Sequence, residues 1–307
     1  GRNDMTIAAI EAGGTKFVLG LYQAEASGCT RPEQLAKASI PTTTPSETLA
    51  RAGDFFSEAA RQAGEPIDVF GIGSFGPVEL KPQSPEWGHI TATPKPHWAG
   101  TDMAGYYHER FNVPVAFDTD VNAAAYAEFL WGGAQGLSDF VYITVGTGIG
   151  GGIFSGGNLV HGLSHPELGH IRIAREPDDP FLGICPFHHD CLEGLASGPA
   201  IAARWDSDPA AIPEGHAAWE LEARYLARAI AAYVLVLSPE AILMGGGVGM
   251  RPGLAEKVCD LVGEELAGYI PALARPGKLP GYVSRPQLGS EAGLLGAAAL
   301  GLRLCVE

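Results

Sequence analysis

The sequence predicts an α/β fold in which two lobes are built around mostly parallel sheets. Runs rich in β-branched and aromatic residues alternate along the chain with longer runs in which apolar residues recur at helical spacing. The chain has 307 residues, which is long for one compact domain, and 46% of them are hydrophobic, which is enough for a sizeable core. Its 42 glycines come in clusters, and such clusters mark tight turns between the expected elements.

The first expected elements are a hairpin, a helix and a strand. The stretch MTIAAIEAGGTKFVLGLY (5–22) has two β-rich runs around a Gly-Gly turn, which is the pattern of a hairpin. Residues 46–64 carry apolar side chains near helical spacing and end on a glycine, so they predict a helix, and IDVFGIG (67–73) predicts a strand. Residues 75–98 are rich in Pro, Gly and Trp without a clear period, and we expect an ordered, functional loop there.

The alternation continues through the rest of the chain. A helix near 102–111 leads into the strand VPVAF (113–117), and the next helix begins near Thr119, where N-cap residues precede a run of alanines. The stretch DFVYITVGTGIGGGIFSGG (139–157) predicts a second hairpin with a glycine turn. The remaining expected elements are a long helix over 216–237, a strand over 241–244, and helices near 251–268 and 290–304.

Charge and cysteine content argue against several classes of protein. The formal net charge is −15, which would repel phosphate backbones, so we expect no nucleic-acid partner. The sequence has no run of 18 or more uninterrupted apolar residues and no charged-then-apolar leader, so we expect a cytoplasmic protein without membrane association. Five cysteines scattered over a long chain are unlike a secreted disulfide framework, which argues against a Cys185–Cys191 disulfide.

Two glycine segments match the dinucleotide fingerprint G-x-G-x-x-G without its structural context. That motif requires a helix N-terminus directly after it to receive the pyrophosphate. GIGSFG (71–76) is followed by Pro77 and a proline-rich loop, and GTGIGG (146–151) is followed by a further strand. A Walker A sequence is also absent, because no Gly-Lys pair is followed by Ser or Thr. Neither segment therefore predicts a Rossmann-type or P-loop site.

Both hairpin turns carry a threonine among glycines, at 13–16 and at 146–148. Successive backbone N–H groups in such turns form an anion-binding concavity, glycine lets the backbone approach closely, and the hydroxyl adds a donor. Either turn alone also fits an ordinary tight hairpin. A third segment, MGGGV (244–248), ends a strand in glycines, where a flat purine can lie against the backbone. The three segments together predict a nucleotide polyphosphate site.

Six motifs follow one another from residue 10 to about residue 300: EAGGTK, DTDVNAAAYAE, VGTGIGGG, HPELGH, CPFHHDCLEG and LMGGGV. Taken together, they resemble the ROK sugar kinases of the hexokinase/actin-like superfamily, most closely the bacterial fructokinase branch. The resemblance implies two actin-like (ribonuclease H-like) lobes with a central cleft. The implied lobes are 5–118, which has the first phosphate hairpin and receives the helix 290–304, and 119–307, which has the catalytic aspartate, the zinc site and the adenosine segment.

The resemblance also assigns the nucleotide site. The two hairpins grip the ATP phosphates, and the third glycine segment faces the adenosine. Relatives often carry Asp where this chain has Glu11, a carboxylate that organises Mg²⁺ through water, so the extra methylene shifts that group. The expected cofactor-binding residues are Glu11, Gly13, Gly14, Thr15, Lys16, Gly146, Thr147, Gly148, Gly245, Gly246 and Gly247.

Asp120 is the expected catalytic base. It lies in the first turn of the helix that begins near Thr119, where the helix dipole favours the anion. On local sequence alone a capping role would be the simpler interpretation. The match of Asp120-Val-Asn122 to the catalytic segment of the family favours catalysis instead and leaves Asp118 as the nearer candidate for the cap. Thr119, where relatives often have Asn, and Asp120 are also expected to bind the sugar.

The resemblance places the remaining sugar contacts beside a structural zinc ion. Glu167, His170 and Glu193 are expected to contact sugar hydroxyls, and His170 also to bind the metal. The other expected zinc ligands are Cys185, His188 and Cys191, whose C-x₂-H-x₂-C spacing with His170 gives a closed Cys₂His₂ set; His189 or His165 could replace His188. A closed site has no position for water, so the expected role of the zinc is to aim Glu167 and Glu193 at the sugar.

These expectations define one main function and two alternatives. The main prediction is ATP-dependent phosphorylation of a hexose 6-hydroxyl, with D-fructose as first choice, by a homodimer that uses Mg²⁺. The first alternative is a mannokinase or glucokinase of the same family. The second is a catalytically inactive sugar-sensing protein, which the presence of Asp120 and both phosphate hairpins disfavours. A repressor with an N-terminal helix-turn-helix is not expected, because the phosphate hairpin begins by residue 11.

Overall fold

The computed structural model describes residues 4–28 and 30–307, which form two compact units. The first unit comprises Gly1–Trp131, His161–His165 and Glu291–Glu307, and the second comprises Gly132–Val160 and Pro166–Ser290. Each unit has its own five-stranded sheet and its own hydrophobic core.

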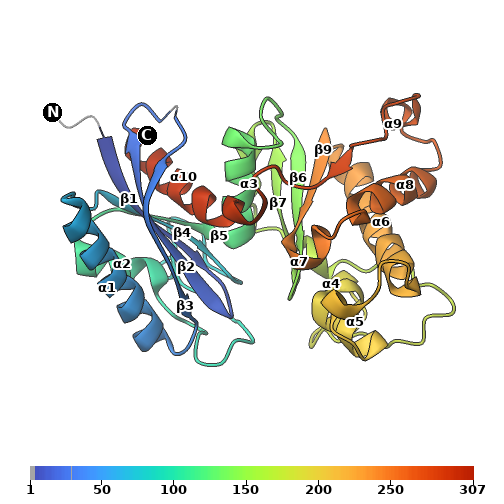
Figure 1. Ribbon diagram of the computed structural model, residues 1–307, viewed down its shortest axis with the longest axis horizontal. Helices are drawn as coiled ribbons and strands as arrows, with labels where there is room; N and C mark the ends of the chain where they lie inside the picture. The colour runs from blue at the N-terminus through green and yellow to red at the C-terminus, as the bar shows by residue number, and fades with distance from the viewer. Residues whose placement is uncertain (1–3, 29) are drawn as a thin grey trace. The chain divides into compact units, whose positions relative to one another are not determined.

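The sheet of the first unit is mixed. Its strand order is β3 (Glu33–Pro41), β2 (Lys16–Glu25), β1 (Asp4–Ala12), β4 (Val69–Ser74) and β5 (Val115–Thr119) (Figure 1). The pairs β1–β2 and β2–β3 are antiparallel, whereas β1–β4 and β4–β5 are parallel. The carboxyl ends of β1, β4 and β5 therefore meet at one edge of the sheet.

Helices cover both faces of this first sheet. They are α1 (Pro45–Ala63) and α2 (Met103–Phe111), which pack together on one face, and α3 (Asp120–Trp131) and α10 (Ala292–Val306), which pack together on the other (Figure 1). The Thr44 side chain caps α1, and Gly64 ends it in the left-handed conformation. α10 lies very close to β4, because a Cβ at Gly71 would be 1.8 Å from the Ala297 carbonyl oxygen.

The sheet of the second unit repeats this topology. Its strand order is β10 (Val283–Ser284), β9 (Ala241–Gly245), β6 (Phe140–Val145), β7 (Ile149–Ser155) and β8 (Asn158–Leu159). Taken in chain order, the first strand is again central, the second and third extend antiparallel on one side, and the fourth and fifth extend parallel on the other. The carboxyl ends of β6 and β9 meet at one edge, as those of β1 and β4 do in the first unit.

The second unit has a long helix, α6 (Ala217–Leu237), whose inward face is almost completely buried. The other helices are α4 (Leu192–Ala196), α5 (Gly198–Trp205), α7 (Gly246–Gly249), α8 (Leu254–Leu266) and α9 (Pro271–Ala274), with 3₁₀ turns η1 (Leu168–His170), η2 (Pro209–Ala211) and η3 (Gly289–Glu291). α6 packs against α8 and α4. Between β8 and α6 lies a long segment that carries the cysteine and histidine cluster.

The structure confirms the α/β fold, both hairpins and the main helices. One expectation was wrong, because the sheets are mixed rather than mostly parallel: each has two parallel and two antiparallel pairings. The sequence also did not predict β3, α4 or α5. The first compact unit includes α3, beyond the expected division at 118/119, because α10 packs along that helix.

One helical stretch, Gly289–Val306, is long and apolar enough to be considered as a membrane span by length and composition. Of that stretch 61% is buried, and α10 packs on β1, β4 and α3. Packing inside the first unit accounts for its apolar character.

Candidate functional site

The turn 13–16, which joins β1 and β2 in the first predicted phosphate hairpin, is held on one side by hydrogen bonds from Thr42. The Gly13 N–H donates to the Lys16 carbonyl oxygen at 2.9 Å, which closes the turn. Thr42 supports it twice: its N–H donates to the Thr15 carbonyl oxygen at 2.9 Å and its hydroxyl donates to the Gly13 carbonyl oxygen at 2.7 Å. A Cβ at Gly14 would meet nothing within 4 Å, and Thr15 is exposed. The outer side of the turn therefore has room for a ligand.

Glu11 lies at the end of β1 against the first turn of α10. A Cβ at Gly293 would lie 1.6 Å from Glu11 Oε2, so a larger residue there would displace this carboxylate. Burial raises the pKa of Glu11, and the charges of Lys16 and Lys37 oppose that rise. A cation bound nearby would stabilise the charged form. This environment is compatible with the expected role in organising Mg²⁺, which stays a prediction.

The start of α3 differs in one detail from the expected arrangement. The cap is Thr119, whose hydroxyl oxygen accepts the Asn122 N–H at 3.0 Å, and not Asp118. Asp118 is buried at the end of β5, and its Oδ1 accepts the Thr119 N–H and the Asn122 Nδ2–H, both at 2.7 Å. The expectation of Asp118 as the cap was wrong because its carboxylate holds the Asn122 side chain instead of a backbone N–H of the first turn.

Asp120 is the first residue of α3 and is half-buried. Its Oδ1 accepts the Val121 N–H at 2.9 Å, and the helix N-terminus stabilises its negative charge. β4 approaches this turn closely, since a Cβ at Gly73 would lie 3.3 Å from the Asp120 Cα. The carboxylate therefore lies where the loop after β4 begins.

One edge of the first sheet brings three of the predicted features together. The turn 13–16 follows β1, the loop 75–98 follows β4, and Asp120 follows β5. The Phe75 N–H donates to the Ala12 carbonyl oxygen at 2.8 Å, which ties the start of the loop to the start of the turn. The loop is ordered: Trp98 is fully buried and its Nε1–H donates to the Thr43 carbonyl oxygen at 2.8 Å. Ligand sites in α/β proteins commonly lie at such an edge.

The equivalent edge of the second sheet brings the other two nucleotide segments together. The Gly146 N–H donates to the Gly148 carbonyl oxygen at 2.9 Å, and a Cβ at Gly146 would lie 3.8 Å from the Gly247 nitrogen. Gly246 has a φ of 86°, and a Cβ there would lie 2.4 Å from the Val145 carbonyl oxygen. The hairpin turn and the glycine segment 245–247 are thus in backbone contact.

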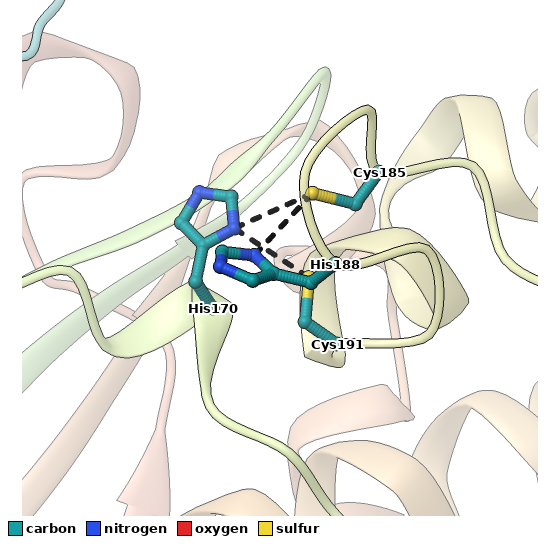
Figure 2. Close-up of side chains that lie close together, drawn as sticks. All are labelled: His170, Cys185, His188 and Cys191. Atoms are coloured by element: carbon teal, nitrogen blue, oxygen red, sulfur yellow. Dashed lines mark hydrogen bonds between the residues drawn. The ribbon is translucent and has the colours of Figure 1, made fainter.

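Figure 2 shows four side chains of the second unit that point toward one another: His170, Cys185, His188 and Cys191. Cys185 Sγ lies 3.7 Å from His170 Nδ1 and 3.6 Å from His188 Nδ1, and Cys191 Sγ lies 3.5 Å from His170 Nδ1. With Zn–S bonds of about 2.3 Å and Zn–N bonds of about 2.0–2.1 Å, sulfur and nitrogen ligands of tetrahedral zinc lie about 3.5 Å apart. The four side chains fit a closed zinc site.

Local backbone bonds form this cluster without a disulfide. Cys185 and His189 exchange two backbone hydrogen bonds, of 3.2 and 2.9 Å, which turn the chain so that His188 faces His170. Cys185 and Cys191 are both free and buried. Burial raises the pKa of the Cys191 thiol to about 11, so a bound cation is needed to hold it as a thiolate near neutral pH.

The other two histidines that were considered as ligands lie outside the cluster. Among the described residues, the grouped ligand atoms are those of His170, Cys185, His188 and Cys191, without His189 or His165. His165 belongs to the first unit, where its Nε2 accepts the Val78 N–H at 3.2 Å.

Glu193 connects this cluster to the second hairpin. Its Oε1 accepts the Ile149 N–H at 2.9 Å, and its Oε2 lies 3.6 Å from Nε2 of His170, on the ring edge opposite the Nδ1 that faces the thiols. A Cβ at Gly148 would lie 2.7 Å from Oε1, so a larger residue there would displace the Glu193 carboxylate. A carboxylate beside the second nitrogen of a metal-binding histidine is the usual arrangement. A contact of Glu193 with a sugar, as expected from the sequence, would therefore have to form beside or in place of its contacts with Ile149 and His170.

Glu167 lies just before the cluster in the chain, and two unpredicted residues bond to the hairpin turns. Glu167 is exposed just before η1, and its carbonyl oxygen accepts the His170 N–H at 3.1 Å. Gly198 and Thr42 were not predicted from the sequence. The Gly198 N–H, at the start of α5, donates to the Gly146 carbonyl oxygen at 2.7 Å. The Ser-Gly-Pro helix start at 197–199 was the available signal for Gly198. No local pattern indicates Thr42.

The sequence profile of the ROK family matches residues 7–303. The chain belongs to the ROK family. It is 43% identical to a fructokinase of Zymomonas mobilis over 308 residues, with 98% of each chain covered, and 38% identical to a fructokinase of Pediococcus pentosaceus over 296 residues, with 96% and 97% covered.

Solved structures of the family share the fold. The ROK hexokinase of Thermus thermophilus has a TM-score of 0.74 at 28% identity, with 98% of this chain and 99% of that chain covered. The ROK glucokinase of Streptomyces griseus, in complex with glucose and AMPPNP, has a TM-score of 0.69 at 26% identity, with 97% and 99% covered. The two units are thus the lobes of the actin-like sugar-kinase fold.

Proposed function

We propose that this protein transfers the γ-phosphoryl group of ATP to the 6-hydroxyl of D-fructose, which gives fructose 6-phosphate and ADP. The observation that carries this proposal is the position of Asp120. It is a half-buried carboxylate at a helix N-terminus, at the same sheet edge as a glycine-threonine hairpin and an ordered loop. The two fructokinases that cover nearly the whole chain at 38–43% identity support fructose as the acceptor.

Asp120 acts as the general base. It accepts the proton of the 6-hydroxyl while that oxygen attacks the γ-phosphorus and the bond to the bridging oxygen breaks, so that ADP leaves. The helix N-terminus keeps the carboxylate charged before the reaction, and the Val121 N–H fixes one of its oxygens. Thr119 lies directly before the base and is proposed to orient the same hydroxyl group.

Both hairpins and the glycine segment hold the nucleotide. The turns at 13–16 and 146–148 are proposed to offer backbone N–H groups and a threonine hydroxyl to the phosphates. The segment 245–247, in backbone contact with the second turn, is proposed to lie against the adenosine. Glu11 helps to organise the Mg²⁺ that accompanies ATP and neutralises the phosphate charge.

Three further residues are proposed to bind the sugar, with metal support. Glu167, His170 and Glu193 contact hydroxyl groups, and His170, Cys185, His188 and Cys191 hold a structural zinc ion. A closed Cys₂His₂ set leaves no coordination position for water, so the zinc supplies rigidity and no chemical step. Glu193 extends that rigidity to the second hairpin through Ile149.

Glucose and mannose are the competing acceptors. A glucokinase of the family shares the fold at 26% identity, whereas the named fructokinases are closer in sequence over the same length. A catalytically inactive sensor would not need a carboxylate at the start of α3 beside a phosphate hairpin.

We further propose that the enzyme is a cytoplasmic homodimer that binds neither nucleic acid nor membranes, and light scattering on the purified protein would test the dimer.

A coupled assay of ADP release against a panel of hexoses tests the function. We expect turnover with fructose to exceed turnover with mannose and glucose, and the product to be fructose 6-phosphate. Preference for glucose would assign the second candidate function. Equal absence of turnover with every hexose in the presence of Mg²⁺ and ATP would contradict a kinase.

A further inference from the structure

A short segment with two histidines is fastened to the catalytic part of the first unit. Residues His161–His165 belong to the first unit, although β8 before them and Pro166 after them belong to the second. His161 Nε2 lies 2.7 Å from Asp118 Oδ2, and His165 Nε2 accepts the Val78 N–H at 3.2 Å. The first contact reaches the strand that ends at the catalytic turn, and the second reaches the loop after β4.

The carboxylate of Asp118 connects His161 to the start of α3. Its side chain is 8% exposed, so its charge requires close partners. Oδ1 faces the helix and accepts from the Thr119 N–H and from Asn122 Nδ2, while Oδ2 faces His161. His161 is the cationic partner that lies in direct contact with this carboxylate.

Asn122 depends on this arrangement. Its Oδ1 is buried and has no hydrogen-bond partner in the described part of the chain, so the bond from Nδ2 to Asp118 holds the amide. The N–H of the same residue bonds to Thr119 Oγ1, which caps the helix at Asp120. A rotation of Asp118 would therefore disturb the turn that carries the proposed base.

We propose that His161 is a positioning residue that fixes Asp118 and, through Asn122 and Thr119, aims the Asp120 carboxylate at the acceptor hydroxyl. The proposal rests on the proposed function only for the role of Asp120. His161 itself is half-exposed and acts through Asp118, so it is not assigned any proton transfer. The contact links a segment 43 residues further along the chain to the catalytic turn.

The charge on His161 gives this contact a measurable signature. The hydrogen bond to Asp118 raises the pKa of His161, with the Asp118 charge adding to the rise, while burial and the charge of Arg303 on α10 oppose it. The ion pair is complete at pH values below the raised pKa and weakens as the pH rises through it. The orientation of the Asp120 carboxylate should therefore become less well fixed at pH values above the pKa of His161.

The test compares two substitutions of His161. Leu removes the donor and the charge at similar size, whereas Gln keeps an N–H donor without a titrating group. We expect His161→Leu to lower kcat by about 10- to 100-fold, as is usual for a partner that orients a catalytic group, with little change in KM for ATP. His161→Gln should recover most of kcat and lose the alkaline decline of kcat that we expect for the wild-type enzyme. His108→Gln, which alters a histidine of α2 bonded to the Val113 carbonyl oxygen, is the matched control and should leave kcat unchanged.

Nuclear magnetic resonance of the histidine side chains keeps the proposal testable if His161→Leu fails to fold. In the wild-type protein His161 should titrate above its ordinary pKa, and Asp118→Asn should lower that value. This readout needs no substrate, so it separates a wrong hexose assignment from a wrong role for His161. Equal kcat in the wild-type enzyme and a folded His161→Leu variant, or an ordinary pKa for His161, would overturn the proposal.

Discussion

The two units share one sheet topology but support their hairpin turns in different ways. In the first unit, Thr42 supports the turn 13–16 directly where β3 leads into α1. In the second unit, the segment between β8 and α6 brings Glu193 and Gly198 to the turn 146–148. His170 of the cysteine and histidine cluster contacts Glu193 at 3.6 Å. Under the proposed function, one sheet topology serves two tasks: the first unit adds the proposed catalytic carboxylate after its last strand, and the second places a set of cysteine and histidine side chains that could hold a metal next to the proposed nucleotide-binding turn.

The largest expected effect is the loss of turnover on substitution of Asp120 in the first unit. Turnover and substrate affinity are measured separately, so that a catalytic role can be distinguished from a binding role. Asp120→Asn should lower turnover by about 10²- to 10⁴-fold, because a general base is lost while the amide preserves size and the bond from Val121. Calorimetry should find ATP and fructose affinity nearly unchanged. Asp54→Asn, on the exposed face of α1, is the matched control and should retain turnover. Lost sugar affinity with residual turnover little changed would reassign Asp120 to binding.

Removal of the metal should loosen the second unit selectively. Cys191→Ser, or slow chelation, should destabilise the protein and increase hydrogen exchange in 184–194 and in 146–151, because Glu193 loses the ring of His170 that fixes it. The turn 13–16, which rests on Thr42, should exchange as before. Elemental analysis of the wild-type protein should find about one zinc per chain, as one tetrahedral ligand set requires.

Two other outcomes of metal removal would contradict the proposed difference between the two turns. If chelation left exchange in 146–151 unchanged, the bond from Ile149 to Glu193 would not transmit support from the metal. A metal-free preparation with full activity and unchanged sugar affinity would leave the cluster without a role in this enzyme.

Glycine substitutions should distinguish the segment 245–247 from the turn 13–16 by the space available for a Cβ. Gly246→Ala should destabilise the protein by about 1–3 kcal/mol, because the backbone has a φ of 86° and the new methyl group would press on the Val145 carbonyl. It should also weaken ATP binding. Gly14→Ala is the matched control for stability, since a Cβ there meets nothing within 4 Å. Thermal unfolding and calorimetry give both values, and equal costs for the two variants would contradict the geometry.

The smallest effect should come from the direct support in the first unit. Thr42→Val removes the hydroxyl donor to Gly13 but keeps the backbone bond to Thr15, so we expect a cost of about 0.5–1.5 kcal/mol. Glu193→Ala leaves the Ile149 N–H without its partner and should cost about 1–3 kcal/mol. Denaturant unfolding would measure both. A larger loss of unfolding free energy for Thr42→Val than for Glu193→Ala would contradict the expectation that the turn 146–148 depends more strongly on its side-chain support than the turn 13–16 does.

Local patterns predicted much of the fold. Both hairpins were predicted because a Gly-Gly or Gly-Thr-Gly turn between β-rich runs is a short-range signal, and the main helices because their apolar spacing extends over many residues. β3 was missed because its sequence, EQLAKASIP, is polar and largely exposed. The sheets are mixed because each predicted hairpin, β1–β2 and β6–β7, is antiparallel and gains a further antiparallel strand, β3 or β8.

The candidate site was predictable only where its residues lie close in sequence. The ligand spacing of Cys185, His188 and Cys191 could be read directly, and the structure groups them with His170. Contacts between distant residues could not be inferred: Glu193 meets Ile149 across 44 positions, and His161 meets Asp118 across 43. Such pairs depend on how the strands align, which the local sequence does not determine.

The most direct test of the central claim is phosphorus magnetic resonance of the enzyme with fructose, ATP and Mg²⁺. We predict that the γ-phosphate signal of ATP disappears while a fructose 6-phosphate signal grows at the same rate, and that Asp120→Asn slows both together. ATP consumption without any sugar phosphate, from fructose or from another hexose, would contradict the account.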